Sequence, residues 1–127
     1  MLDSTEHDVE VEICFLRTEE GGRKGPARSG YRPQFYYDGN DWDAVHTYAT
    51  DDWVQPGETV TGYLDFLSPD EHVAKLFPGM EFLCREGSRV VARGRVLRIL
   101  NLRVSAERMR EHRRSTGQDN PASAADV

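Results

Sequence analysis

The chain has 127 residues, of which 38% are hydrophobic and 30% are charged, which suits one small domain and excludes a catalytic fold with a separate substrate domain. The longest apolar runs, such as Ile13–Leu16, span only a few residues and are too short to cross a bilayer. Residues 1–10 are acidic, unlike a secretory signal, and two cysteines, Cys14 and Cys84, are too few for a disulfide scaffold. We therefore expect a cytoplasmic protein without a membrane partner.

Apolar and polar residues alternate from Val9 to Phe15, and similar alternation recurs between turn signals such as Gln55–Glu58. The six strands predicted in this way are Val9–Leu16, Tyr31–Tyr37, Trp42–Ala49, Thr59–Leu67, Met80–Arg85 and Val90–Leu100. One short helical turn is predicted at Asp70–Phe77, before a Pro-Gly break. Many short strands with almost no helix predict an all-β fold, an antiparallel barrel or sandwich.

The end of the chain differs in composition from the strands. Ser105–Arg114 contains helix-forming residues and predicts a short basic helix, whereas Thr116–Val127 is small and polar. We therefore predict four parts: a flexible N-terminus at 1–7, a β domain at 8–103, a basic helical extension at 104–115 and a disordered tail at 116–127.

Charge is distributed unevenly along the chain. Residues 1–84 carry 6 basic and 17 acidic side chains, whereas residues 85–114 carry 10 basic and 3 acidic ones. Arg89, Arg93 and Arg95 have the spacing that places side chains on one face of a regular strand. A basic side of the molecule is expected from these three together with Arg103, Arg108, Arg110, Arg113 and Arg114. Such a surface either contacts a polyanion or is a solvated face that balances the acidic half, and both alternatives stay open.

Two segments carry a specific resemblance to a known family. Glu20–Arg23 reads EGGR and is followed, after six residues, by Gly30–Tyr37, which reads GYRPQFYY. This arrangement resembles the C-terminal β-barrel, the third domain, of bacterial elongation factor Tu, where an EGGR loop precedes a GYRPQFYF strand by the same interval. Val54–Glu58 resembles the MPGD turn of that domain, and Phe82–Gly94 resembles its closing FAIREGGRTVGAG hairpin. The resemblance runs over about residues 9–100 and implies a six-stranded antiparallel barrel.

In elongation factor Tu this barrel packs on the GTPase domain and touches the T stem of aminoacyl-tRNA. The resemblance carries the RNA-contacting role onto six positions of this chain: Arg23, Lys24, Arg32, Gln34, Glu86 and Gly87. Arginine is a multi-donor for phosphate, and a carboxylate can accept from a ribose 2′-hydroxyl. The resemblance also implies that the turns around Arg23 and Glu86 lie side by side. A structural alternative stays open, in which the arginines pair with acids and the glycines serve only turn geometry.

The chain departs from the family pattern after the second matched segment. Where the family has basic and hydroxyl residues, this sequence has an acidic stretch with an aromatic residue: Asp38, Asp41, Trp42 and Asp43, with Asp51 and Asp52 shortly after. Carboxylates facing phosphates are unfavourable within the screening length of ~8 Å. This stretch supports an alternative function, a protein–protein adaptor whose acidic-aromatic loop binds a basic partner and whose arginine-rich face binds an acidic one.

No other motif points to chemistry. The sequence contains no GxxxxGK[ST] phosphate loop, so GTP binding by that route is not expected. His46 with Asp41 and Asp43 is the grouping closest to a metal or acid–base site, and one histidine among turn aspartates is a common surface pattern. We therefore predict a free-standing, non-enzymatic, translation-associated binding module without metal or cofactor. Its expected partner is tRNA or another structured RNA, or a translation protein.

Overall fold

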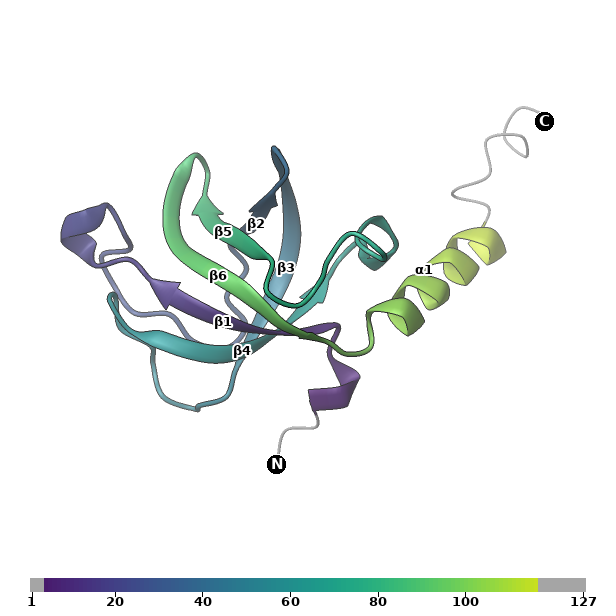
Figure 1. Cartoon of the computed structure of the whole chain (residues 1–127), viewed down its shortest axis with the longest axis horizontal. Coiled ribbons are helices and arrows are strands. Elements are labelled where there is room, and N and C mark those ends of the chain that lie inside the picture. The colour runs from purple at the N-terminus through teal and green to yellow at the C-terminus, as the bar shows by residue number, and fades with distance from the viewer. Residues whose placement is uncertain (1–3, 117–127) are drawn as a thin grey trace.

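Six antiparallel strands close into a barrel, which confirms the fold predicted from the sequence (Figure 1). The strands are β1 (Val9–Phe15), β2 (Gln34–Tyr37), β3 (Asn40–Tyr48), β4 (Thr59–Phe66), β5 (Glu81–Glu86) and β6 (Arg89–Ile99). Their order around the barrel is β1-β4-β3-β2-β5-β6, and β6 pairs back onto β1. Closure leaves no open sheet edge.

The computed structural model of this chain describes residues 4–116. Residues 1–3 of the predicted flexible N-terminus and residues 117–127 of the predicted tail lie outside the described residues. Ser4–Glu6 form a short 3-10 helix, η1, and His7 follows with its Nδ1 atom 2.6 Å from Asp65 Oδ2. Among the helices of residues 4–116, none is long and apolar enough to cross a membrane.

The alternation in β1 places an apolar stripe inside the barrel. Val9, Val11 and Ile13 have no exposed surface, whereas Glu10 and Glu12 between them lie on the outer face. Each fully buried aliphatic side chain of this size stabilises the fold by about 1.5–3 kcal/mol relative to an exposed one. The strand is therefore held in register by its own pattern, because a shift of one residue would exchange the two faces.

A cluster of phenylalanine rings fills the barrel next to β2. The ring centroid of Phe35 lies 5.0 Å from that of Phe66 and 4.3 Å from that of Phe82. Phe82 in β5 pairs with Gly94 in β6, and a Cβ atom added to Gly94 would lie only 2.1 Å from the Phe82 ring. Gly94 is therefore required because the ring occupies the space of any side chain at that position.

One feature of β6 differs from the prediction. Between Cys84 and Arg85 the register of β5 with β6 shifts by one residue. The extra residue in β6 turns Arg89 to the opposite side of the sheet from Arg93 and Arg95. The prediction that these three arginines share one face is therefore wrong, since it assumed a regular strand.

The segment after β4 is also less helical than predicted. It forms a 3-10 helix, η3 (Pro69–Glu71), in place of a helical turn over Asp70–Phe77. Ala74 has a positive φ of 69°, which interrupts a right-handed helical run.

The helix α1 (Leu102–Thr116) follows the barrel directly and packs against η3. It begins three residues before Ser105, where the sequence predicted its start, because Leu102 and Ala106 are buried against the rest of the molecule. In Figure 1, α1 extends from the barrel at the end opposite the short helix η2 (Thr18–Glu20).

Two histidines are buried as neutral rings. The Nδ1 atom of His46 lies 2.7 Å from the Tyr48 hydroxyl, and that of His72 lies 2.8 Å from the Tyr37 hydroxyl. Burial lowers the pKa of His46 to about 3 and the pKa of His72 to about 4. Both rings therefore stay uncharged in the fold at neutral pH.

We expect Gly94→Ala to lower the free energy of unfolding by about 1–3 kcal/mol, because the new methyl group overlaps the Phe82 ring. Urea denaturation measures the change. In a Phe82→Leu background the same substitution is expected to cost clearly less, since the smaller side chain leaves room. An equal cost in both backgrounds would contradict this packing.

We also expect acid to destabilise the fold through the two buried histidines. Their folded pKa values lie below the unfolded value of 6.5, so the unfolded chain takes up protons first as the pH falls below about 6.5. Each ring then costs about 2 kcal/mol at a pH of about 5. In chemical denaturation of His46→Gln and His72→Gln, the free energy of unfolding should depend less on pH between about 6.5 and about 5 than it does in wild type. An unchanged pH dependence would contradict the role of the two histidines.

Candidate functional site

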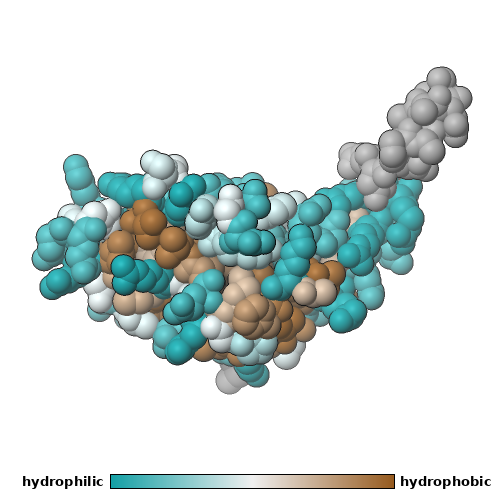
Figure 2. Space-filling model, turned by 45° about the horizontal axis from the view of Figure 1, so that its top comes forward, coloured by the Kyte–Doolittle hydropathy of each residue, from teal (hydrophilic) through white to brown (hydrophobic). Residues whose placement is uncertain are grey.

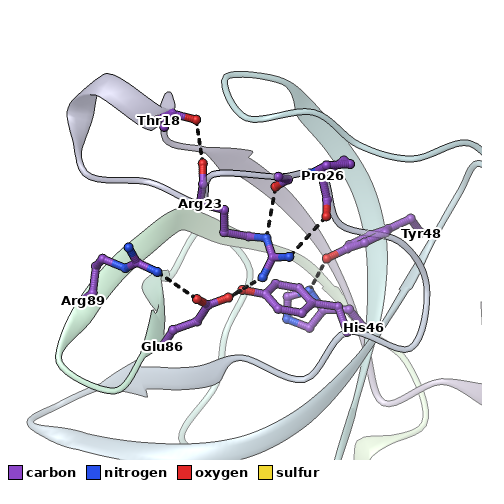
Figure 3. A network of polar contacts seen from close by, with 9 residues as sticks. Thr18, Arg23, Pro26, His46, Tyr48, Glu86 and Arg89 are labelled. Carbon is purple, nitrogen blue, oxygen red and sulfur yellow. Dashed lines mark hydrogen bonds and ion pairs between the residues drawn. The ribbon is translucent and has the colours of Figure 1, made fainter.

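Two turns far apart in the sequence meet side by side (Figure 3), as the resemblance implied. Loop 17–33 carries Arg23, whose guanidinium forms an ion pair with the carboxylate of Glu86 at the β5–β6 turn. The Tyr31 hydroxyl donates to the same carboxylate oxygen, and Arg89 Nη2 donates to the other at 3.1 Å. We name these four residues, Arg23, Tyr31, Glu86 and Arg89, the corner cluster.

Arg23 uses most of its hydrogen-bonding capacity within the protein. Besides the Glu86 contact, its Nε donates to the Gly25 carbonyl at 3.3 Å and its Nη2 to the Pro26 carbonyl at 3.2 Å. The guanidinium carbon also lies 4.5 Å from the centroid of the Tyr31 ring. Since three of its five N–H donors have protein acceptors and its charge is paired, Arg23 ties loop 17–33 to the β5–β6 hairpin.

The Glu86 side chain is an ionised acceptor at the centre of the corner cluster. Partial burial alone would raise its pKa, but the hydrogen bonds from Tyr31, Arg23 and Arg89 outweigh this and hold the pKa below its usual range. Burial and the bond to Glu86 raise the pKa of Tyr31. Tyr31 therefore stays a neutral donor, and the carboxylate is satisfied by protein groups.

The backbone gives the loop glycines a structural role as well. A Cβ atom on Gly22 would lie 2.4 Å from the Leu16 carbonyl oxygen, and the Gly22 N–H donates to the Arg17 carbonyl at 3.1 Å. An antiparallel bridge between Ala27 and Val54, with hydrogen bonds of 2.9 and 2.7 Å, fastens the other half of the loop. The structural alternative left open by the sequence thus accounts for both Arg23 and Gly22.

The other four residues predicted to contact RNA lie around the corner cluster. Lys24 and Arg32 are exposed, and neither makes an ion pair with any residue of the range 4–116. Gln34, on the outer face of β2, donates from Nε2 to Asp43 Oδ1 at 3.1 Å. Gly87 has a φ of 62°, which the tight β5–β6 turn requires. Two unpaired cations therefore flank the corner cluster.

Most of the acidic-aromatic stretch is engaged with the barrel. Arg85 donates to both carboxylate oxygens of Asp41, at 3.1 and 2.6 Å. The Trp42 ring packs edge-to-face on His72 with 4.7 Å between centroids. Asp38 is exposed in the β2–β3 turn, where it has a φ of 51°. Of the residues predicted to bind a protein partner, Asp41, Trp42 and Asp43 therefore have partners within the chain.

Sequence reasoning did not single out Tyr31, and it assigned Arg89 to the basic side without its contact to Glu86, although both residues lie within the segments that carry the resemblance. It also missed the pairing of Arg28 with Trp53, in which the guanidinium carbon lies 4.8 Å from the ring centroid. Trp53 remains 51% exposed. No sequence signal joins these two residues, because they lie on different loops that only the Ala27–Val54 bridge brings together.

The outer arginines of β6 face glutamates of β1. Arg95 pairs with Glu12 at 3.2 Å, and Arg98 pairs with Glu10 at 2.6 Å. The acidic and basic parts of the sequence thus become neighbouring strands with mutual ion pairs. Along this part of β6, the basic side predicted from composition is neutralised.

The grouping of His46 with Asp41 and Asp43 is not assembled. His46 is buried within the barrel, whereas the two aspartates lie exposed on the other face of β3. In residues 4–116, no three His, Cys, Asp or Glu side chains gather into a group that could hold a metal ion. Cys84 is buried, which raises the pKa of its thiol to about 12, and Cys14 lies exposed on the outer face of β1.

We expect Arg23→Met and Glu86→Gln to interact in a double-mutant cycle. The coupling energy in urea denaturation should be about 1–2 kcal/mol, less than for a fully buried pair because the side chains are 25% and 31% exposed. The exposed neighbour Lys24→Met is the control and should change stability by less than about 0.5 kcal/mol. Additive effects of the two substitutions would show that the Arg23–Glu86 contact does not hold the loop.

The family model of the elongation factor Tu C-terminal domain matches residues 4–100. The match spans the six strands of the barrel, and it includes loop 17–33 and the β5–β6 turn that together form the corner cluster. The helix α1 lies beyond it. Because the match covers well over half of the sequence and the barrel has the strand number that the resemblance implied, the chain belongs to the elongation factor Tu C-terminal domain family.

Proposed function

We propose that this protein is a non-catalytic binding module of the translation apparatus and that it binds tRNA or another structured RNA at the surface around the corner cluster. The observation that carries the proposal is the joining of the two turns by Arg23 and Glu86. These are the turns to which the resemblance assigns RNA contact. Membership of a translation-factor domain family favours a translation-related partner.

In this proposal Lys24 and Arg32 supply the attraction to phosphate. Both are exposed and lack an ion-pair partner within the described chain, whereas Arg23 and Glu86 neutralise each other. The corner cluster then acts by holding the surface in one shape. A surface fixed before binding loses less conformational freedom on association than a mobile loop does.

The nearby carboxylate of Asp43, which accepts from Gln34, opposes the approach of phosphates from one side. The proposed site therefore depends on a small number of cations, and its affinity should fall with added salt. The absence of a phosphate-loop motif in the sequence supports a role in binding without nucleotide hydrolysis.

Trp53 supports a second candidate function, a protein adaptor. Its ring is half exposed, and Trp53 directly follows the exposed Asp51 and Asp52 in the sequence. A large aromatic ring beside acidic groups suits a partner that offers a basic and apolar surface. Co-purification of a defined protein that resists nuclease and is lost in Trp53→Ala would favour this function.

Fluorescence anisotropy with a labelled tRNA transcript tests the RNA-binding proposal. We expect wild-type protein to bind at about 50 mM salt and to lose roughly tenfold or more in affinity by about 200 mM. Lys24→Glu with Arg32→Glu should weaken binding on the order of tenfold, because two attractive contacts become repulsive.

A matched control reverses two exposed cations elsewhere, Lys75→Glu with Arg93→Glu, which changes the net charge by the same amount. Its affinity should stay within about threefold of wild type if the contacts are local. No binding at low salt, or an equal loss in the two double variants, would count against the proposal.

A further inference from the structure

The helix α1 is the part of the described chain that the family match does not reach. The match ends at residue 100, and α1 begins at Leu102. The helix is nevertheless built into the molecule, since Leu102 and Ala106 are 1% and 0% exposed. Its apolar side is therefore occupied by the rest of the chain.

Two side-chain contacts hold α1 at points about two turns apart. The Ser105 hydroxyl donates to the carboxylate of Asp8, just before β1. The Arg113 guanidinium pairs with Asp70 of η3. The helix is thereby fixed near its start and near its end, so that its outer side chains extend from a rigid support.

The outer surface of α1 carries a row of unpaired arginines. At ~100° per residue, Arg103, Arg110 and Arg114 fall within about 40° of one another and span about 16 Å of the axis. All three are exposed, and none has an ion-pair partner in the part of the chain that the structure describes. We name these three residues the arginine stripe. Figure 2 shows hydrophilic side chains over the outer part of α1.

The charge of the helix remains positive after its own acids are included. It contains five arginines and two glutamates, Glu107 and Glu111. Arg113 is paired with Asp70, which leaves four arginines against the two glutamates. The β6 arginines that pair with Glu10 and Glu12 leave no excess of positive charge.

We propose that the arginine stripe of α1 binds the sugar–phosphate backbone of RNA. The inference rests on the proposed RNA-binding function and names a second surface for it, outside the family domain. Guanidinium groups form bidentate hydrogen bonds with phosphate oxygens, and a stripe on a fixed helix loses little freedom on binding. In Figure 1, α1 and η2 of loop 17–33 lie at opposite ends of the molecule, so the two surfaces contact different parts of an RNA.

Two other kinds of partner fit the stripe less well. A membrane or a hydrophobic groove would need an apolar helix face, and that face is buried at Leu102 and Ala106. A protein interface is built around aromatic or aliphatic anchors, and Val104 is the one large apolar side chain of α1 that is exposed. The arginine stripe therefore fits a polyanion, which it would bind through charge.

The experiment measures the affinity of the full chain for a labelled tRNA transcript and a short RNA duplex as a function of salt. The test variant carries Arg103→Gln, Arg110→Gln and Arg114→Gln, which keep the helix propensity of these exposed positions. The matched control carries Arg93→Gln, Arg95→Gln and Arg98→Gln on β6, with the same loss of charge. A third variant, Glu107→Gln with Glu111→Gln, removes the opposing charges from α1.

We expect the α1 variant to bind at least about tenfold more weakly than wild type, with a salt slope lower by about 2–3. The β6 control should stay within about threefold, and the glutamate variant should bind more tightly. Circular dichroism should show unchanged helix content. Equal affinities for wild type and the α1 variant, or equal losses in the α1 variant and the β6 control, would overturn the inference.

Comparison with Lys24→Glu plus Arg32→Glu separates this inference from the proposed function at the corner cluster. Binding that depends on α1 but not on Lys24 and Arg32 would support the stripe and contradict the corner. Binding that depends on Lys24 and Arg32 alone would support the proposed site at the corner cluster and contradict the arginine stripe. A wild-type protein that binds neither RNA at about 50 mM salt would contradict both.

Discussion

The carboxylate of Glu86 is the constraint on which the surface of this protein depends. It accepts from Arg23 and Tyr31 of loop 17–33 and from Arg89 of its own hairpin. These bonds outweigh the effect of partial burial and keep the group ionised. A long loop rich in glycine would otherwise be free to sample many conformations. Through one ionised side chain, the loop and the hairpin become a single surface.

Arginines on the outer face of the barrel are also neutralised by nearby carboxylates. Arg85 is paired with Asp41, and Arg95 and Arg98 are paired with glutamates of β1. Opposite charges that are separate in the sequence become neighbours because β6 closes the barrel against β1. Unpaired positive charge is gathered beside the corner cluster and along α1, at the rims of the molecule, whereas Arg93 is, within residues 4–116, a single unpaired cation of β6. We regard these rims as the places where a polyanion would be attracted.

The strands of the barrel could be predicted because the signals for them lie within short segments of the sequence. The alternation in β1 and the turn signals at residues 38–41 and 55–58 depend on neighbouring residues, and the order of motifs carried the family resemblance. The juxtaposition of Arg23 and Glu86 followed from that resemblance and not from spacing. The register shift in β6 could not be read, since nothing in its sequence marks the extra residue that redirects Arg89.

The sequence could not show which predicted site residues are free and which are paired, for a different reason. Whether an arginine is free or paired depends on strand neighbours, and the pairs Gln34–Asp43 and Arg85–Asp41 arise only from the β2–β3 and β2–β5 registers. Trp42 lies on the same face of β3 as the buried Ala44 and His46, and only the fold brings His72 against its ring. Residue type suggested a binding role for each predicted site residue. The contacts in the folded chain give several of these residues a structural role.

Amide hydrogen exchange, measured residue by residue in wild type and Glu86→Gln, tests most directly that the Glu86 carboxylate fastens loop 17–33. The Gly22 amide donates to the Arg17 carbonyl within loop 17–33, and the Ala27 amide donates to the Val54 carbonyl across the bridge that joins the loop to the next segment. The account predicts that these amides exchange faster by on the order of tenfold in the variant, while the amides of β1 and β4 keep their protection. Unchanged exchange in the loop, or an equal increase throughout the barrel, would contradict it.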